Sequence, residues 1–514
     1  MPTPLVAIYA FGSAGDVMPM LALGRALHTQ CGYRVRIVAP AKWEEKVCKE
    51  GLEYFDLKAE GIAAVAVDSF LMSLFDFLLS QNDPISKSTT TFDPKEVGRF
   101  VTHRKTIQGI MPLMRALIPV LKFLFKTADE HLKGVDLAIL TNAALQLRED
   151  CEKRGIPTVA CYLQPSQATK DYPPPVLGLE YQPDNDKARR SNLMTWLSLG
   201  IRSLWIFNPI LQERRRALGL RRGFLPSYIT AIYDIIQLMI REARARAAMP
   251  FICTFSPALV PIASDFKPTM DFVQSGPLQL EADQYAEPFS APVELDEFLA
   301  SGKIVYFGYG SLQKLGPTST KEIDHMTIWL TAIQELESQG VKLRAVFAFS
   351  WGPDDVSADP TNTKYHALRE QLDAMIQQKK VYRLVGSFPH TYLFPRCHVA
   401  VHHGGAGTTQ TAAKYRLPAI IVPHVVDQPF MASVAKYRGI ANVIDLDDFS
   451  TSTLVGALKD ILVDRAEYFK KNCDRIGDEM AKENPIGDAV ALVQRTLQKA
   501  RSATSDASSE NTAV

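Results

Sequence analysis

Short apolar segments alternate with helix-forming stretches near both ends of the chain. The strands predicted in the first half lie at residues 5–11, 35–39, 136–141 and 158–162. The strands predicted in the second half lie at 304–307, 343–349, 398–402 and 419–422, with helices near 321–338, 362–378, 408–416 and 429–437. Strands that are apolar along their whole length, with helices between them, are typical of parallel sheets covered on both faces. The pattern therefore predicts an α/β protein with two such units.

The segments around these units set the predicted domain boundaries. Residues 1–277 form the first domain and residues 301–465 the second. Between them, residues 278–300 are acidic, contain two prolines and show weak periodicity, which is typical of an interdomain linker. Helices follow over 466–500, and the tail 501–514, rich in Ser, Ala and Thr, is predicted to be disordered.

The most apolar segments belong to the middle of the first domain and are found at 70–79, 110–125, 196–211 and 228–240. Each contains a charged residue, and none has the ~18 uninterrupted apolar residues of a bilayer span. We expect helices of the protein core, with a groove for a lipophilic ligand as the alternative. The N-terminal sequence MPTPLVAIYAFGSAGD is typical of a strand entering a turn and not of a signal peptide.

Composition and charge narrow the classes of partner. The 514 residues include 57 basic and 56 acidic side chains, a net charge of +1, which argues against a nucleic-acid partner held by bulk charge. The seven cysteines form no C-x-x-C pair, so reduced thiols in a cytoplasmic protein are expected. Two basic runs, at 213–222 and 241–246, favour solvated helix faces, with an anion patch or a transient membrane-surface contact as the alternative.

The strongest chemical signal is AVHHGGAGTTQTAAKYRLPAIIVPHVVDQPFM at residues 400–431. In it a strand ends at two histidines, three glycines form a turn, and two threonines open a helix. A helix N-terminus presents unpaired N–H groups and a partial positive charge, so it binds anions. Glycines let a phosphate approach the backbone, and threonine or histidine side chains can donate to its oxygens. The pattern predicts a phosphate site without the Gly-Lys-Ser/Thr ending of a Walker loop. A purely structural turn is the alternative.

This motif resembles the donor-binding signature of UDP-sugar-dependent family 1 glycosyltransferases. The similarity is to the branch that holds fungal sterol glucosyltransferases and bacterial antibiotic-aglycone and rhamnolipid glycosyltransferases. Further blocks similar to that branch follow in order along nearly the whole chain, at 12–27 (GSAGDVMPMLALGRAL), 256–261 (SPALVP), 306–311 (YFGYGS) and 387–396 (SFPHTYLFPR). The resemblance implies a GT-B fold, in which two Rossmann-like domains face each other across a cleft. The N-terminal domain would bind the acceptor, the C-terminal domain would bind the nucleotide sugar, and the last helices would pack back on the N-terminal domain.

The same resemblance implies the donor contacts. His403 matches the histidine that contacts the diphosphate, whereas His402 is expected to be structural or to orient its neighbour. Phe388 falls where the family lines the uracil pocket. Thr411 stands where the plant branch carries a glutamate for the ribose, so the ribose contact stays unassigned. The positions implied to hold phosphates are Gly310, Ser311, Gly405, Gly407, Thr408 and Thr409, and those implied to bond sugar hydroxyls are Asp427 and Gln428.

Asp16 is the candidate catalytic base, because the resemblance implies a direct displacement in which the acceptor hydroxyl must lose its proton. A placed carboxylate contributes typically ~10²–10⁴-fold in such a step. A helix N-cap is the alternative role for Asp16, and His28 and His103 are rival bases. The implied chemistry uses no metal and no bound cofactor, since the UDP-sugar is a co-substrate.

The resemblance implies an inverting hexosyltransferase that moves a sugar, with glucose favoured, to a hydroxyl of a sterol, a terpenoid or another secondary-metabolite aglycone. Motifs do not fix the acceptor, because acceptor choice lies in pocket shape. The alternatives are a transferase acting on a hydroxy fatty acid, a nucleotide-sugar epimerase and a non-transferring lipid-binding relative. A nicotinamide oxidoreductase is disfavoured because the turn at 12–15 is not G-x-G-x-x-G and the strand at 35–39 ends without an acid. We expect a cytoplasmic protein, peripheral to membranes at most.

Overall fold

The computed structural model describes most of the chain, namely residues 3–12, 14–56, 107–220, 249–266, 270–281, 283–287, 289–309, 320–349, 363–385 and 388–510. Several sequence predictions fall on residues outside these ranges. They concern the phosphate positions Gly310 and Ser311, the rival base His103, the apolar segments at 70–79 and 228–240, and the basic run at 241–246.

The N-terminal domain is built on a parallel sheet with the order β3-β2-β1-β4-β5-β6-β7 in the described residues. Its strands are β1 (Leu5–Tyr9), β2 (Arg34–Ala39), β3 (Glu53–Asp56), β4 (Leu137–Thr141), β5 (Thr158–Tyr162), β6 (Phe251–Cys253) and β7 (Phe272–Gln274). The interior strand β1 pairs Val6 with Val35 on one side and with Leu137 on the other. The strand order reverses between β1 and β4, as in a doubly wound, Rossmann-like sheet, which confirms the predicted parallel α/β unit.

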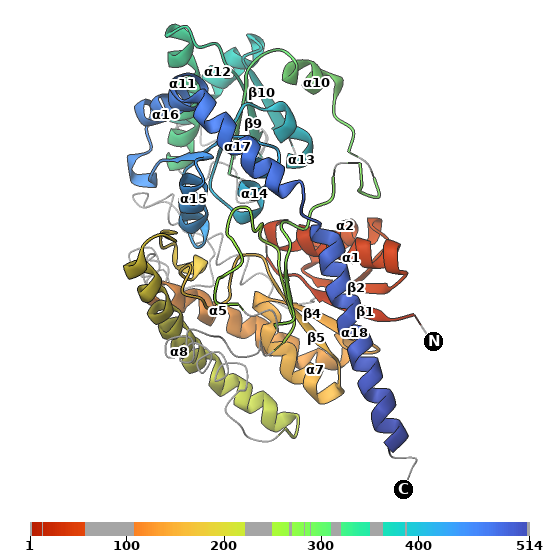
Figure 1. The fold of residues 1–514 in the computed structure, drawn as a ribbon. Helices are drawn as coiled ribbons and strands as arrows, with labels where there is room; N and C mark the ends of the chain where they lie inside the picture. The colour runs from red at the N-terminus through yellow and green to blue at the C-terminus, as the bar shows by residue number, and fades with distance from the viewer. Residues whose placement is uncertain are drawn as a thin grey trace.

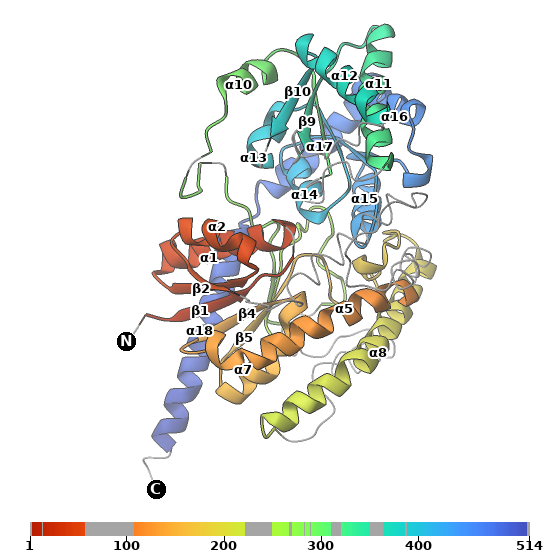
Figure 2. The same cartoon turned by 180° about the vertical axis from the view of Figure 1, so that it is seen from behind.

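Helices cover both faces of this sheet (Figures 1 and 2). They are α1 (Ala14–Cys31), α2 (Glu44–Lys49), α5 (Ile107–Lys126), α6 (Ala128–His131), α7 (Arg148–Arg154) and α8 (Asp186–Ala217). Because side chains alternate along a strand, Val6 and Ile8 of β1 pack with α1, whereas Leu5, Ala7 and Tyr9 pack with α5 and α7. Both faces are therefore apolar, as the continuous hydrophobic pattern predicted.

The C-terminal domain repeats the design with the strand order β10-β9-β8-β11-β12-β13, again parallel. Its strands are β8 (Ile304–Gly308), β9 (Arg344–Phe349), β10 (Val381–Val385), β11 (Val399–His402), β12 (Ala419–Ile421) and β13 (Ala441–Val443). Its helices are α10 (Val293–Leu299), α11 (Thr320–Ser338), α12 (Thr363–Gln377), α13 (His390–Leu393), α14 (Ala406–Lys414), α15 (Gln428–Tyr437), α16 (Thr451–Lys459) and α17 (Ala466–Met480). The four strands predicted in this half are confirmed.

Two connections join the domains. In the first, α10 packs with the C-terminal sheet, since Leu295 and Phe298 are buried beside Ile304, so the end of the predicted linker is part of that domain. In the second, α17 lies over the C-terminal domain and α18 (Pro485–Glu510) runs along the N-terminal domain in both views (Figures 1 and 2). Ala489 and Val493 of α18 enter the core that contains β1. This helix continues to Glu510, further than the predicted helical segment.

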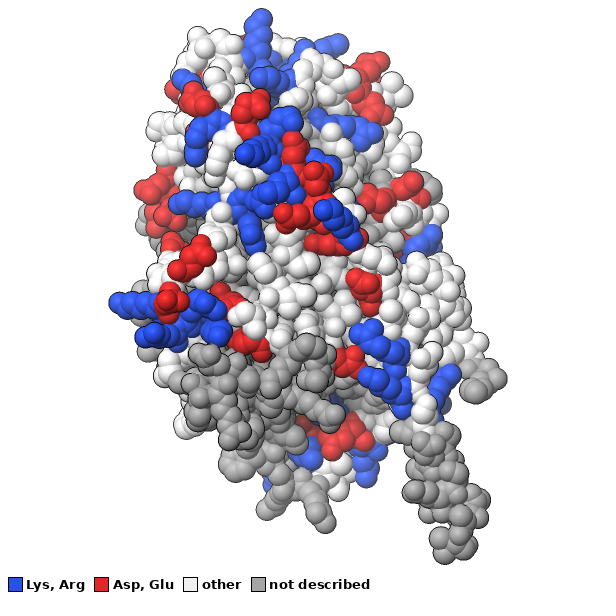
Figure 3. All heavy atoms as spheres, viewed as in Figure 1, with Lys and Arg blue, Asp and Glu red and all other residues white. Residues whose placement is uncertain are grey.

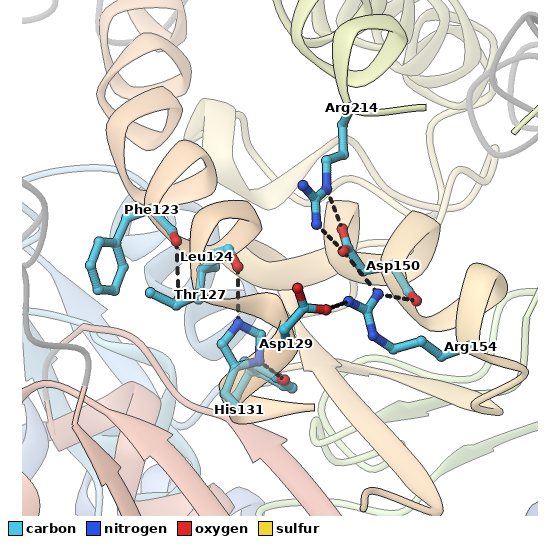
Figure 4. A network of polar contacts seen from close by, with 9 residues as sticks. Phe123, Leu124, Thr127, Asp129, His131, Asp150, Arg154 and Arg214 are labelled. Atoms are coloured by element: carbon cyan, nitrogen blue, oxygen red, sulfur yellow. Dashed lines mark hydrogen bonds and ion pairs between the residues drawn. The ribbon is translucent and has the colours of Figure 1, made fainter. Parts of the chain in front are cut away.

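The basic run at 213–222 includes the end of α8 and is only partly solvated where the structure describes it, since Arg216 is exposed but Arg214 and Arg215 pair with acids. Arg215 is buried and pairs with Glu149 of α7, and the Nε atom of Arg214 donates to Asp150 over 3.0 Å. Figure 4 shows Arg214 and Arg154 pointing at Asp150 from α8 and α7. The solvated-face prediction is therefore wrong for Arg214 and Arg215, because they pair with the buried acids Asp150 and Glu149 of α7. In the described residues, no helix has the length and apolarity needed to cross a membrane.

Candidate active site

The glycine-rich motif forms the turn between β11 and α14. Gly404 has a φ of +88°, and a Cβ atom there would lie 2.8 Å from the Cγ2 atom of Ile421 and 3.2 Å from the carbonyl oxygen of Gln428. Only glycine fits this left-handed, crowded position without strain. The close approach also brings the turn directly against Gln428, so the predicted phosphate positions lie beside one of the predicted sugar positions.

The N-terminus of α14 is not capped by a side chain. Its N-cap residue is Gly405, which has no side-chain oxygen to accept from the first-turn N–H groups. Thr408 and Thr409 are buried in that turn, and the hydroxyl of Thr409 has no hydrogen-bond partner among the described residues. Gly407 is exposed, and a side chain there would meet no neighbour within 4 Å. These groups form a donor-rich helix end suited to an anion.

His403 lies beside this helix end. Its side chain is 7% exposed, and its Nδ1 atom has no hydrogen-bond partner in the described part of the chain. Burial, with a smaller effect of His390, lowers the pKa of His403 to about 3, so the ring is neutral at physiological pH. A Cβ atom at position 405 would lie 2.5 Å from its Nε2 atom. Gly405 therefore makes room for the ring.

His402 faces the turn itself. The backbone N–H of Gly404 donates to its Nδ1 atom over 3.0 Å, so the ring proton is on Nε2. Burial, together with the neighbouring His403 and His390, lowers the pKa of His402 well below its usual range. The bond to Gly404 gives His402 a structural role in the turn, in agreement with the expectation from sequence.

Asp427 and Gln428 stand at the start of α15, as its N-cap and its first residue, after the loop at 423–426. The Oε1 atom of Gln428 accepts from the backbone N–H groups of His424, at 2.8 Å, and Val425, at 3.1 Å. Val426 has a φ of +56°, which is an outlier for a β-branched residue and is typical of strain held at functional sites. The side-chain oxygen of Gln428 thus holds the backbone of the loop. Its side-chain amide nitrogen is left as the group able to bond a sugar.

Asp427 is held in a poorly hydrated position. Burial raises the pKa of its carboxyl to about 6, although its own backbone and the Gln164 side chain favour the charged form. The Nε2 atom of Gln164 donates to its Oδ2 atom over 3.2 Å. Gln164 comes from the loop after β5 in the other domain, and no motif in the sequence predicts this contact.

Asp16 lies at the carboxyl end of β1. The helix α1 begins at Ala14, which places Asp16 inside the first turn and not at the N-cap. Its carboxylate lies against Gly12, where any side chain would collide with it. The rival base His28 is twelve residues further along α1, roughly 18 Å away at 1.5 Å per residue, and binds the carbonyl oxygen of Tyr33. Of these two candidates, only Asp16 lies at the strand ends.

The remaining predicted positions are placed around the linker. Phe388 packs edge-on against Phe289 of the linker, with ring centroids 5.3 Å apart. Thr411, the position of the missing ribose glutamate, donates to the carbonyl oxygen of Gly407 and accepts from the side chain of Gln279. The Oε1 atom of Gln279 is buried without a hydrogen-bond partner in the described residues. Gln279 of the linker therefore lies beside Thr411.

The two domains meet along the carboxyl ends of their strands. Gln410 of α14 accepts from the backbone N–H of Ser256 at 2.8 Å and donates to the carbonyl oxygen of Thr254 at 3.1 Å. These residues follow β6, next to β5 in the sheet. Asp16 lies at the same sheet edge, two strand positions from β5, or roughly 10 Å at the usual strand spacing. The candidate base and the candidate donor residues thus face the same interdomain region.

Comparison with known families agrees with this architecture. Residues 6–100 match the glycosyltransferase family 28 N-terminal domain. Residues 368–494 match the erythromycin biosynthesis protein CIII-like C-terminal domain, a range that includes β11, α14 and α15. The two matches fall on the two α/β units separately.

Curated relatives align with nearly the whole chain. A sterol 3-beta-glucosyltransferase of Arabidopsis thaliana is 26% identical over 98% of this chain and 68% of its own length. A sterol 3-beta-glucosyltransferase of Debaryomyces hansenii is 27% identical over 98% of this chain, which spans only 28% of that relative. The chain thus spans about two thirds of the plant relative and less than a third of this yeast one.

Solved structures share the fold. The glycotransferase of kitacinnamycin superposes with a TM-score of 0.58 at 16% identity, covering 96% of this chain and all of that one. A Streptomyces sp. SF2575 glycosyltransferase, solved with thymidine diphosphate, superposes with a TM-score of 0.51 at 16% identity, covering 96% of this chain and 99% of that one. Together with the two domain matches, these comparisons show that the chain has the GT-B fold of two Rossmann-like domains and is similar to the sterol glucosyltransferases and to bacterial glycosyltransferases.

Proposed function

We propose that this glycosyltransferase moves glucose from UDP-glucose to the hydroxyl of a sterol or a similar lipophilic alcohol. Two relatives named as sterol 3-beta-glucosyltransferases align over 98% of the chain, which supports both the donor sugar and the acceptor class. A structural neighbour solved with thymidine diphosphate supports a nucleoside diphosphate as the group that this fold binds.

The observation that carries the proposal is the uncapped N-terminus of α14. The first-turn N–H groups behind Gly405, the hydroxyl of Thr409 and the neutral ring of His403 are donors gathered at one place. A neutral histidine can donate one hydrogen bond to a phosphate oxygen while adding no charge that must be desolvated. These donors would hold the diphosphate of UDP and stabilise the negative charge that grows on it as the sugar leaves.

The reaction we propose is a single displacement with inversion. Asp16 accepts the proton of the acceptor hydroxyl, and the hydroxyl oxygen forms a bond to the anomeric carbon of glucose. The bond from that carbon to the diphosphate oxygen breaks, and its electron pair leaves with UDP. Asp427 and the amide nitrogen of Gln428 bond the sugar hydroxyls during the transfer. The scheme uses no metal and no bound cofactor.

We also propose that the protein contacts membrane surfaces through α8, where a lipophilic acceptor would be found. Met194, Ile201 and Trp205 are 53%, 47% and 83% exposed, and their spacing puts them on one face of the helix. Basic side chains gather near the N-terminal end of α8 (Figure 3), where Lys187 and Arg190 are exposed. Weaker sedimentation of Trp205→Ser with anionic vesicles would support this contact, and equal sedimentation would refute it.

The cytoplasm is the compartment that we propose. All seven cysteines are free thiols, and four of them, Cys151, Cys161, Cys253 and Cys473, are buried. A chain with this many unpaired thiols is best suited to a reducing compartment.

The proposal is tested by measuring UDP release from UDP-glucose with and without sterol-containing vesicles. We expect release only when the sterol is present, with a β-glucoside as product by NMR. Turnover of the sugar nucleotide without an acceptor would favour an epimerase. Binding without any turnover would favour a lipid-binding module. Turnover with hydroxy fatty acids and not with sterols would move the acceptor to that class.

A further inference from the structure

Asp427 is the N-cap residue of α15, but its carboxylate does not cap the helix. Its backbone angles, φ −85° and ψ −11°, lie in the helical region, and no side-chain cap bond forms. A capping aspartate normally has extended angles that aim its oxygen at the second or third N–H group. Val426, at φ +56°, turns the chain just before it. The backbone of this loop therefore directs the carboxylate away from its own helix.

The carboxylate meets a residue of the other domain. The Nε2 atom of Gln164 donates to the Oδ2 atom of Asp427 over 3.2 Å, across 263 positions of sequence. Gln164 follows β5 closely, and its backbone carbonyl oxygen lies 3.9 Å from the Sγ atom of Cys253, which donates to it. The glutamine is thus attached to the sheet of the acceptor domain, while its amide reaches the donor loop.

This contact is not what holds the domains together. Around it, the segment 172–184 of the N-terminal domain packs along α15. The backbone N–H of Tyr181 donates to the Oγ atom of Ser433 at 2.8 Å, and the hydroxyl of Tyr437 donates to Asp184 at 2.7 Å. The rings of Tyr181 and Phe430 meet edge to face, with centroids 6.0 Å apart. Removing the Gln164 amide would leave this packing in place.

We propose that Gln164 is a positioning residue that fixes the Asp427 carboxylate for the donor sugar, so that the acceptor domain takes part in donor-sugar recognition. The inference rests on the proposed function, in which Asp427 bonds a sugar hydroxyl. A carboxylate with one oxygen bound to Gln164 keeps the other oxygen in a defined direction. Sugar recognition would then be complete only where the two domains are in contact.

The test compares two ligands that differ only in the sugar. Dissociation constants for UDP and for UDP-glucose are measured by calorimetry on the full chain and on Gln164→Leu, which keeps the size but loses the amide. We expect the affinity for UDP-glucose to fall about tenfold, the typical effect of one hydrogen bond to a charged group, while the affinity for UDP stays unchanged. In turnover assays, KM for UDP-glucose rises more than kcat falls.

Two further variants keep the test decisive. Tyr437→Phe removes an interdomain hydrogen bond of the same helix without touching Asp427, and both affinities should stay at their original values. Gln164→Glu keeps the shape, replaces the donor by an acceptor, and should also weaken only UDP-glucose binding, so it serves if Gln164→Leu does not fold.

Three outcomes would be negative, and they are distinct. Unchanged UDP-glucose binding in both Gln164 variants would overturn the positioning role. An equal loss of UDP and UDP-glucose affinity would assign Gln164 to domain packing, which also overturns it. If the unmodified protein binds UDP but discriminates no sugar, the proposed function fails instead.

Discussion

Two buried histidines, one in each domain, are neutral for the same reason but differ in their hydrogen bonds. Burial lowers the pKa of His131 to about 4 and that of His403 to about 3. His131 uses both ring nitrogens, one with the hydroxyl of Tyr9 at 2.6 Å and one with the carbonyl oxygen of Leu124 at 3.0 Å. The Nδ1 atom of His403 has no such partner in the described residues. An unsatisfied buried polar atom costs about 1–3 kcal/mol, and a ligand that forms a hydrogen bond with it removes this cost.

The surroundings of the two histidines repeat this difference. Near His131, the buried Asp150 accepts from Arg154 and Arg214, and its charge is compensated (Figure 4). Near His403, the hydroxyl of Thr409 and the N-terminus of α14 are left without side-chain partners. The first region stabilises the fold, and the second is arranged for an anion that is not part of the chain. Substitutions at the two regions should therefore affect different properties.

The largest effect is expected from Asp16→Asn, at the carboxyl end of β1. The asparagine keeps the size of the side chain but cannot accept the acceptor proton, so kcat should fall ~10²-fold or more. UDP should still bind, because the diphosphate donors are in the other domain. Steady-state turnover and UDP calorimetry measure the two quantities. Near-normal turnover would remove Asp16 from the role of base and leave it as a helix-stabilising acid in the first turn of α1.

His131→Phe tests the region in which both ring nitrogens of the histidine have hydrogen-bond partners. It should change stability without changing UDP affinity. In the unmodified protein, His131 stays neutral down to about pH 4, whereas the unfolded chain takes up the proton near 6.5. The unfolded state thus binds more protons in this window, and stability falls by about 3 kcal/mol from this group as the pH is lowered from 6.5 to 4. Denaturant unfolding of His131→Phe should show lower stability at pH 7 and a shallower fall on acidification. An unchanged slope would mean that other groups set it.

His403→Ala tests the region at the N-terminus of α14, and it should lower UDP affinity more than it changes stability. UDP affinity should fall about tenfold, the scale of one charge-assisted hydrogen bond, and the rate should fall with it. The free energy of unfolding should change less than in His131→Phe, since no partner atom is left unsatisfied at Nδ1. Calorimetry and denaturant unfolding on both variants give the four values needed. A UDP affinity equal to that of the unmodified protein would place the phosphates elsewhere.

The fold could be predicted from sequence where strands are buried on both faces. Interior strands are apolar along their length because each has a neighbouring strand on both sides, as in β1, β5, β8 and β11. Among the strands that were missed, β3, β7, β10 and β13 are the edges of the two sheets. An edge strand has one neighbour and more contact with solvent, so its pattern is shorter and more polar, as in VYRLV of β10.

The residues of the site also differ in whether their partners are near or far in the sequence. The turn at 402–409 could be predicted because its glycines and histidines act through neighbouring residues. Gln164 and Gln410 could not, because a glutamine is typical of a solvated surface and their partners lie 263 and more than 150 positions away. Arg214 and Arg215 were misjudged for the same reason, since the acids that neutralise them lie on another helix.

The smallest effect is expected from Gln428→Glu, which separates the two functions of one side chain. The glutamate keeps an oxygen to accept from the N–H groups of His424 and Val425, so the loop should be preserved. It loses the amide nitrogen, the group left to donate to a sugar hydroxyl. The preference for UDP-glucose over UDP-xylose, measured as a ratio of kcat/KM values, should therefore shift by a few-fold, about 1 kcal/mol or less. Gln428→Ala should instead weaken both donors, because it also releases the loop. An unaltered ratio in Gln428→Glu would show that the whole side chain is structural, and Gln428 would then belong with His131 and not with His403.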